Sequence, residues 1–190
     1  MITFQKIKWK NFLSTGNQFT EIDFQKHHTN LIIGTNGAGK STMLDALTFV
    51  LFNKPFRKIN KPQLVNATNE RDCLVEIEFE INSRQYVVRR GIKPTVFDIV
   101  VNGTELHREA DDRAMQRVLE DNILKVNYKS FTQIVILGSS TFVPFMQLTT
   151  ANRREVIEDL LDIRIFSLMN NILKDKIRTQ KDQVKSLDLK

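Results

Sequence analysis

The clearest pattern of apolar and polar positions lies in the middle of the chain. Residues 74–81 alternate strictly, with Val75 and Ile77 on the apolar side and glutamates on the other. Strict alternation predicts an antiparallel strand with one face in the core and one in solvent. Four more segments are rich in β-forming residues: 2–12, 19–24, 84–90 and 96–101. With the hairpin signal Asn102-Gly103, they predict an antiparallel β subdomain.

Helical spacing takes over elsewhere. Residues 40–53 place apolar side chains on one helix face, and Pro55 ends the predicted helix. Residues 110–124 predict a second, amphipathic helix. Two short apolar runs that end next to a glycine, 31–33 and 131–137, predict buried strands. Strands and helices in this mixture predict an α/β domain.

Residues 151–190 differ from the rest of the chain. They contain neither Gly nor Pro, and charged and helix-forming residues dominate. Leu173 and Val184 belong to a short coiled-coil seam, although a terminal helix packed on its own domain is the alternative. We therefore expect one domain over residues 1–150 and a long helix over 151–190 that begins a coiled coil. The helical pattern reaches Lys190 without a stop signal, which favours a chain cut from something longer.

Composition limits the classes of function. Of the 190 residues, 41% are hydrophobic, which is enough for a packed core. The net charge of +6 fits contact with nucleic acid, and it fits a solvated basic surface equally well. The single cysteine, Cys73, excludes an internal disulfide and a zinc site made of cysteines. The sequence has neither a signal-peptide pattern nor an apolar stretch of membrane-spanning length, so we expect a cytoplasmic protein without membrane contact.

Residues 34–42 (GTNGAGKST) match the phosphate-loop pattern G-x-x-x-x-G-K-[ST]. Its glycines let successive backbone N–H groups point into one concavity, which opens on the N-terminus of the next helix. Lys40 is expected at the β- and γ-phosphates of ATP, and Ser41 is expected to give its hydroxyl to Mg²⁺. The predicted cofactor-binding residues of the loop are Asn36, Gly37, Ala38, Gly39, Lys40, Ser41 and Thr42.

Hydrolysis of ATP also needs a carboxylate beside the magnesium ion. We looked for an apolar strand that ends in a pair of acids. Asp111-Asp112 follows a polar stretch, and Asp162 lies in the helical segment. Neither position fits, so we expect the catalytic carboxylate on another segment.

Several segments together resemble one family. They are residues 10–14 (KNFLS), 22–24 (IDF), 30–42, 44–47 (LDAL), 129–138 (KSFTQIVILG), and 153–154 with 158–161. In this order they resemble the N-terminal ATPase lobe of SMC-like repair ATPases, the family of SbcC and its Rad-fifty relatives. The similarity is greatest to the branch formed by recombination-exonuclease ATPase subunits of T-even-like phages. One departure is Leu13, where many relatives have an arginine, so an arginine contact to the nucleotide is not carried over.

The resemblance implies a P-loop NTPase with an ABC-type ATPase head divided between the two ends of a long chain. An antiparallel coiled coil joins the halves, and the C-terminal half carries the signature motif, the Walker B acids and the switch histidine. This chain would be the N-terminal half, with its antiparallel β subdomain and the first turns of the coil. That arrangement accounts for the missing carboxylate.

Further site residues follow from the resemblance alone. Gln133 matches the glutamine that joins the Mg²⁺ shell and couples the γ-phosphate to lobe movement; without the family, a strand residue bonding locally is the simpler interpretation. Lys40 and Gln133 are thus the expected catalytic residues, and Ser41 and Gln133 the expected metal ligands. A loop that touches the nucleotide in relatives matches three residues here: Asn66, Ala67 and Thr68.

The family also implies partners. Its ATP-bound heads form homodimers, clamp double-stranded DNA through backbone phosphates and regulate an SbcD-type nuclease subunit. The nuclease would dock near the coil base, residues 155–176, whose apolar face fits a coil seam equally well. A viral relative would work in the host-cell cytoplasm. The basic residues expected at DNA, each of which also fits an ordinary solvated loop, are Lys54, Arg57, Lys58 and Lys61.

Two other functions stay open beside a repair or recombination ATPase that needs its C-terminal half to hydrolyse ATP. An ABC-type transport ATPase would carry a membrane-domain docking surface and a signature motif in the same domain. A chromosome-organising SMC protein would share the head and the coil, and would use ATP as a conformational switch. Neither alternative predicts the phage-like middle of the chain.

Overall fold

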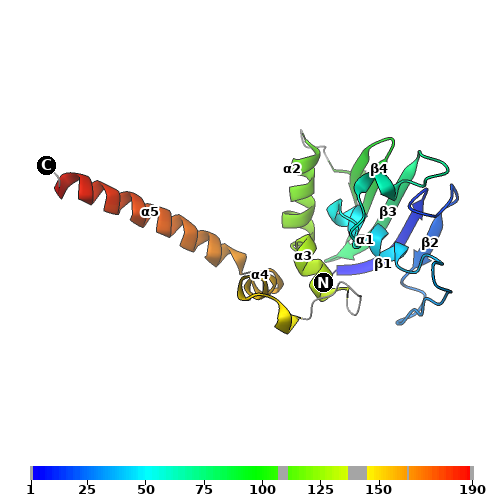
Figure 1. Ribbon diagram of the computed structural model, residues 1–190, viewed down its shortest axis with the longest axis horizontal. Helices are drawn as coiled ribbons and strands as arrows, with labels where there is room; N and C mark the ends of the chain where they lie inside the picture. The colour runs from blue at the N-terminus through cyan, green and yellow to red at the C-terminus, as the bar shows by residue number, and fades with distance from the viewer. Residues whose placement is uncertain (1, 107–110, 137–144, 162, 189–190) are drawn as a thin grey trace. The chain divides into compact units, whose positions relative to one another are not determined.

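The computed structural model describes residues 2–106, 111–136, 145–161 and 163–188. The chain divides into two compact units, Met1–Phe142 and Val143–Lys190. The first unit holds the sheet and the helices α1, α2 and α3, and the second holds α4 and α5 (Figure 1). Within the described part of the chain, no helix combines the length and apolar character needed to cross a bilayer.

The first unit is built on a six-stranded sheet with the order β2-β1-β3-β4-β5-β6. Every neighbouring pair of strands is antiparallel. The strands are β1 (Ile2–Lys10), β2 (Thr20–Asp23), β3 (Cys73–Ile81), β4 (Arg84–Ile92), β5 (Val96–Val101) and β6 (Thr104–Glu105). The predicted β subdomain is confirmed. So is its hairpin turn, where Asn102 and Gly103 have φ angles of 49° and 81°.

Helix α1 (Thr42–Phe52) packs on the sheet against β3 and β4 (Figure 1). Its apolar side chains meet the apolar side of the strands: Phe49 is fully buried, and its ring centroid lies 5.6 Å from that of Phe12. The helix ends at Asn53, whose φ of 58° is the left-handed conformation of a helix C-terminus. The helix predicted over residues 40–53 is therefore confirmed.

Shorter helical segments complete this unit. The 3-10 helix η1 (Lys61–Leu64) follows α1 in sequence. Helix α2 (Asp112–Arg117) continues into the π-helical segment η2 (Val118–Leu124), which contacts α1. These two segments confirm the predicted amphipathic helix, whose first residue lies outside the described residues. Helix α3 (Tyr128–Ile134) also contacts α1.

The strand predicted over residues 131–137 is wrong, because most of this run lies in α3; its last residue is outside the described part. The side chain of Asn127 accepts a hydrogen bond from the backbone N–H of Ser130 at 2.9 Å and caps the helix. Phe131 then packs against Phe52 of α1, with ring centroids 5.1 Å apart. A capped first turn and an anchored aromatic ring favour a helix over the β-branched composition of the run.

The buried strand predicted over residues 31–33 is also wrong. This segment is coil, and Leu31 and Ile33 are each 82% exposed. A buried strand needs neighbouring strands that satisfy its backbone N–H and C=O groups. None of the strands among the described residues lies beside this segment in the sheet. The apolar run is real, but this chain gives it nothing to pair with.

One polar side chain on the sheet is less solvated than its alternation predicts. Glu76 of β3 is only 5% exposed, and it forms ion pairs with Lys8 of β1 and Arg89 of β4. Burial by itself raises the pKa of Glu76, but the hydrogen bonds and charges of the two cations outweigh it, so the net pKa is lowered. The fully wet face predicted for this strand is therefore wrong at Glu76.

The second unit consists of η3 (Phe145–Gln147), α4 (Thr150–Leu160) and α5 (Arg164–Asp188). Two helices thus stand where one long helix was predicted, and the candidate carboxylate Asp162 between them lies outside the described residues. The apolar side chains of α5 are largely exposed, as those of a coiled-coil helix without its partner helix would be. The start of a coiled coil stays a prediction.

Candidate nucleotide-binding site

The phosphate loop leads directly into α1. Gly37 and Gly39 have φ angles of 86° and 88°, a conformation that residues with a side chain rarely adopt. This backbone turns the loop so that it ends at Ser41, the residue before the first turn of α1. Lys40 is exposed, and its Nζ donates to the carbonyl oxygens of Gly34 and Thr35 at 2.7 and 2.8 Å. The lysine therefore folds back over its own loop.

A cavity of about 620 Å³ lies in front of the loop. Its walls include six of the predicted cofactor residues and one from the second predicted loop: Asn36, Gly37, Gly39, Lys40, Ser41, Thr42 and Ala67. The structure thus brings together segments that are about 25 residues apart in sequence. Ala38, Asn66 and Thr68 do not line this cavity.

Asn66 acts through the backbone that it holds. Its side-chain Nδ2 donates to the carbonyls of Leu13 and Thr15, while its Oδ1 accepts from the backbone N–H groups of Thr68 and Asn69. Asn66 is 8% exposed. It therefore ties the second loop to the turn after β1 and sets the cavity wall without lining it.

Other walls of the cavity come from segments that were not predicted to form the site. The turn after β1 contributes Leu13 and Ser14, and the region around η1 contributes Ile59, Gln63 and Val65. An isolated bridge between Phe12 and Val65 and a hydrogen bond from the Leu13 N–H to the Leu64 carbonyl hold these segments together. No local sequence signal marks such long-range pairing, although the family resemblance of residues 10–14 already pointed at one wall.

Arg57, predicted at DNA, lines the phosphate-loop cavity, and its contact with DNA stays a prediction. Asp45 of α1 is fully buried and accepts from the Arg57 backbone N–H at 2.9 Å and from Nε at 2.7 Å. The Arg57 guanidinium also forms an ion pair with the same carboxylate. This contact fixes the segment that follows α1 and places a positive charge at the cavity.

Gln133 lies on α3 and does not line the cavity. Its side-chain Oε1 is buried and has no hydrogen-bond partner among the described residues. An unpaired buried acceptor is costly, which is unusual unless another group reaches it. Its role as a metal ligand stays a prediction.

The remaining predicted DNA residues separate. Lys54 and Lys61 line a second cavity, beside the C-terminal end of α1. The Lys54 Nζ lies 5.6 Å from the ring centroid of Tyr128. Lys58 is exposed and lines neither of these cavities. Contact of any of them with DNA stays a prediction.

The fold and the loop agree with what the chain is similar to. It matches the AAA domain family over residues 6–190. It is 44% identical over 169 residues to exonuclease subunit 2 of Enterobacteria phage T4, which covers 89% of this chain and 30% of the relative. It is 41% identical over 185 residues to exonuclease subunit 2 of Escherichia phage RB69, which covers 97% of this chain and 33% of the relative. The chain therefore spans about a third of the length of these relatives.

More distant similarities point the same way. The SbcC subunit of nuclease SbcCD from Staphylococcus aureus (strain Newman) is 29% identical over 185 residues, covering 87% of this chain and 18% of the relative. The Smc head domain from Pyrococcus furiosus matches all of this chain and 49% of its own, with a TM-score of 0.63 and 23% identity. The latter likeness shows an SMC-type head fold. Because the family match covers almost the whole chain, this protein belongs to the AAA domain family of ATPases, as a relative of phage exonuclease subunit 2 and SbcC.

Proposed function

We propose that this chain is the N-terminal lobe of an ATPase of DNA double-strand-break repair or recombination, and that it binds ATP with Mg²⁺ at the phosphate loop. One observation carries the proposal: Gly37 and Gly39 form a left-handed cradle that presents Lys40 and Ser41 to a cavity of about 620 Å³ at the start of α1. The cavity lies in the size range of small-molecule sites, about 300–1,000 Å³. Its backbone N–H groups and cation suit a polyphosphate.

Different residues of the site would contact the phosphates and the magnesium ion. Lys40 would exchange its two carbonyl partners for the β- and γ-phosphates, and the Ser41 hydroxyl would hold Mg²⁺. Magnesium, when bound, neutralises phosphate charge. The unpartnered Oε1 of Gln133 supports a role as a further magnesium ligand, reached once α3 and the loop approach each other. Arg57, ion-paired with Asp45, adds a guanidinium to the wall of the same cavity.

The C-terminal half of the same ATPase would complete the site. The exposed run 31–33 supports this, because it has the composition of a buried strand and no strand beside it within the described residues. A neighbouring strand from the missing half would cover it and bring the catalytic carboxylate. Hydrolysis by this chain alone should therefore be slow.

The names of the relatives support a nuclease partner. They are called exonuclease subunit 2 and the SbcC subunit of nuclease SbcCD. A solved structure of similar fold, with a TM-score of 0.57 and 23% identity, comes from work on ATP-driven dimerization and DNA stimulated activation of SMC ATPases. We accordingly propose ATP-dependent pairing of two heads, contact with duplex DNA and regulation of a nuclease that docks near 155–176, all in the cytoplasm of the host cell.

A chromosome-organising SMC head is the second candidate, favoured by the TM-score of 0.63 with the Smc head domain. That likeness, at 23% identity, concerns the fold alone. The 44% identity with a phage exonuclease subunit favours the repair or recombination ATPase. A transport ATPase has no comparable support.

Nucleotide binding tests the proposal directly. A fluorescent ATP analogue should bind the 190-residue chain in the presence of Mg²⁺, and Lys40→Ala should weaken this by roughly tenfold or more, since it removes a charged contact to phosphate. Lys174→Ala, an exposed lysine of α5, is the matched control and should bind as the parent chain does.

The same samples report on hydrolysis. The parent chain should turn ATP over very slowly until the C-terminal half is added. Fast turnover by this chain alone that is abolished in Lys40→Ala would overturn the divided-site proposal, while equal nucleotide binding by all variants would overturn the assignment of the loop.

A further inference from the structure

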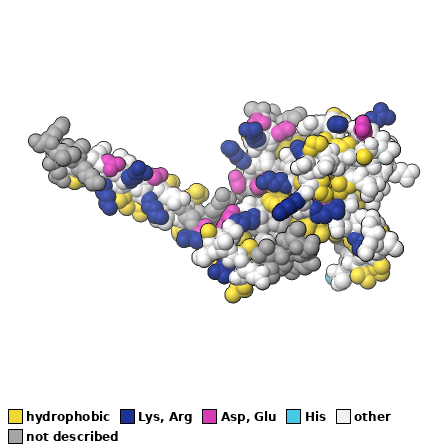
Figure 2. Space-filling model, viewed as in Figure 1, with side chains coloured by type: hydrophobic (Ala, Val, Ile, Leu, Met, Phe, Trp, Pro, Cys, Tyr) yellow, Lys and Arg dark blue, Asp and Glu magenta, His cyan; other side chains and the backbone are white. Residues whose placement is uncertain are grey.

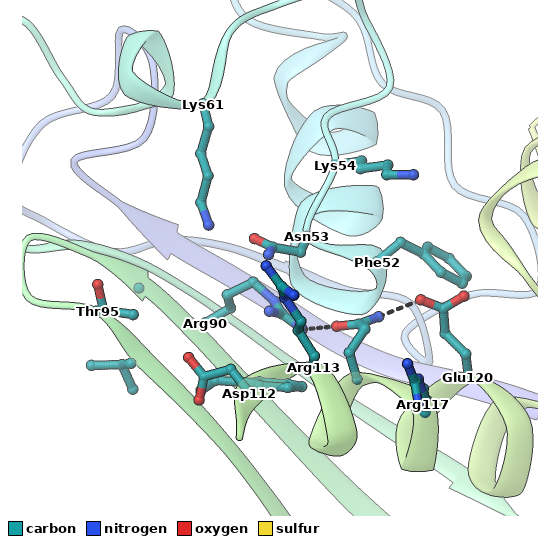
Figure 3. Close-up of a pocket in the computed structure, with 14 residues that line it drawn as sticks. Phe52, Asn53, Lys54, Lys61, Arg90, Thr95, Asp112, Arg113, Arg117 and Glu120 are labelled. Atoms are coloured by element: carbon teal, nitrogen blue, oxygen red, sulfur yellow. Dashed lines mark hydrogen bonds between the residues drawn. The ribbon is translucent and has the colours of Figure 1, made fainter. Parts of the chain in front are cut away.

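A second cavity, of about 450 Å³, lies at the opposite end of α1 from the phosphate loop (Figure 3). The C-terminal end of α1, the strands β4 and β5, and the helical segments α2 and η2 form its walls. Five of its side chains are cationic and two are carboxylates: Lys54, Lys61, Arg90, Arg113, Arg117, Asp112 and Glu120. Figure 2 shows Lys and Arg side chains gathered over α2 and the neighbouring part of the sheet.

Arg90 forms the floor of this cavity. It is 5% exposed, and its guanidinium lies 3.7 Å from the ring centroid of Phe97. Its Nε donates to the Val50 carbonyl at 3.1 Å, and its Nη2 donates to Gln116 Oε1 at 2.6 Å. The bond to Val50 caps the C-terminus of α1, and the bond to Gln116 of α2 holds the guanidinium in place, which gives part of Arg90 a structural role.

The two hydrogen bonds of Arg90 use only two of its three guanidinium nitrogens, Nε and Nη2. The third nitrogen, Nη1, has no hydrogen-bond partner among the described residues, and Arg90 forms no ion pair there. A buried cation of this kind is costly, and burial lowers the pKa of Arg90 to about 9, although Asp112 and Glu120 partly offset this. Arg90 is thus a buried, fixed donor whose charge has no direct counter-ion in the part of the chain that the structure describes.

Three further cations surround this donor without being neutralised by direct contact. The side chains of Lys61, Arg113 and Arg117 have neither a hydrogen bond nor an ion pair to any residue that the structure describes. Burial and the charge of Arg90 both lower the pKa of Lys61, which Asp112 partly opposes. Figure 3 shows the Lys61 ammonium and the Arg113 guanidinium directed toward the same space beside Arg90. An anion bound between them would relieve this repulsion.

The two carboxylates do not remove the excess of positive charge. Glu120 accepts a hydrogen bond from Gln116 Nε2 at 2.6 Å, and Asp112 has its own contact within the chain. Cations still exceed carboxylates by three among the lining residues. This excess favours a dianion over a single carboxylate, and a phosphate monoester carries roughly −1.5 to −2 charges at neutral pH. The fork of an arginine also matches phosphate oxygens in geometry.

We propose that this cavity is a second phosphate site, which binds the phosphate of a nucleoside monophosphate against Arg90, Lys61 and Arg113. A volume of about 450 Å³ admits a single nucleotide and excludes a duplex. The monophosphate comes either from a free nucleotide or from the phosphorylated end of a DNA strand. The proposal stands on this cavity alone and does not depend on ATP binding at the phosphate loop.

The test uses the 190-residue chain carrying Lys40→Ala, which removes the main phosphate contact of the first site. Binding of dAMP is measured by calorimetry, and binding of a short duplex with a 5′-phosphate or a 5′-hydroxyl is measured by fluorescence anisotropy. Lys61→Gln and Arg113→Gln should each weaken binding of the phosphorylated ligand by roughly tenfold or more, because each removes a charged hydrogen-bond donor. Arg90 itself is left in place, because it also caps α1.

Matched controls separate the site from general basic charge. Arg84→Gln removes an exposed arginine at the start of β4 and should leave binding unchanged, and thermal unfolding should show that all variants fold alike. Loss of dAMP binding in the cavity variants alone identifies a free nucleotide as the ligand. Preference for the 5′-phosphorylated duplex, lost in the same variants, identifies a DNA end. Equal binding by cavity and control variants, or no binding of either ligand, overturns the proposal.

Discussion

Apolar side chains are buried on the sheet but exposed in the segment that leads into the phosphate loop. On β3, Ile77 and Phe79 are fully buried, and α1 closes over them. A few residues before α1, Leu31 and Ile33 are just as apolar but lie 82% exposed in coil. The difference shows that this lobe folds around its own antiparallel sheet, whereas the apolar side chains of Leu31 and Ile33, just before the phosphate loop, are left out of the core that the structure describes. Stability and nucleotide chemistry are thus placed on separate parts of one unit.

The largest change in unfolding free energy should come from a substitution in the core between α1 and the sheet. Phe49→Ala removes a fully buried ring that packs on Phe12. The variant should lose about 3–5 kcal/mol of unfolding free energy, since the change leaves a cavity in the core. Urea unfolding followed by circular dichroism measures it. A loss below about 1 kcal/mol would mean that the contact between α1 and the sheet does not carry the stability of the unit.

An intermediate effect should come from the partly buried ion pairs on the sheet. The pKa of Glu76 is lowered in the folded chain, so its contribution is present above its unfolded pKa and is lost as the pH falls through the folded value. Glu76→Gln should cost roughly 1–2 kcal/mol at pH 7, with the value discounted because Arg89 is 45% exposed.

The pH dependence is the sharper part of that measurement. Unfolding free energies of the parent chain and of Glu76→Gln should converge in acid, where the native carboxyl group is also protonated. A difference that stays constant down to about pH 2–3 would contradict an electrostatic origin and indicate a packing defect instead.

The smallest effect should come from the exposed segment. Ile33→Ser removes an apolar side chain that already faces solvent, so the unfolding free energy of the 190-residue chain should change by no more than about 0.5 kcal/mol. The same urea titration detects it. A loss of several kcal/mol would show that the segment is buried in solution and would remove the contrast between the two regions.

Alternation made the sheet predictable from sequence, because the apolar residues at every second position of β3 are buried from Cys73 to Phe79, although Glu76 between them is buried too. The phosphate loop was equally readable, because its glycines and Lys40 follow from phosphate chemistry. The strand predicted at 31–33 failed because an apolar run records burial but not which chain supplies the neighbour. Helix α3 was missed because its start depends on the Asn127 cap and not on periodicity.

The walls of the cavities were the least predictable part. Arg57 was predicted at DNA, and that contact stays a prediction; its place in the wall of the phosphate-loop cavity depends on the tertiary contact with Asp45. Arg90 lies in the predicted strand 84–90, but the sequence does not show that this arginine is buried, because its burial depends on tertiary packing. Pairings such as Phe12 with Val65 depend on contacts between distant segments, for which a single sequence has no local signal.

Helix α1 connects the two cavities, because one lies at each of its ends. Its 11 residues span about 16 Å, with the phosphate loop at one tip and, at the other, the carbonyls of Val50 and Leu51 held by Arg90 and Gln116. A buried helix moves as one piece, since its packed side chains resist sliding. The phosphate loop and the wall of the second cavity are therefore attached to the two ends of one rigid body.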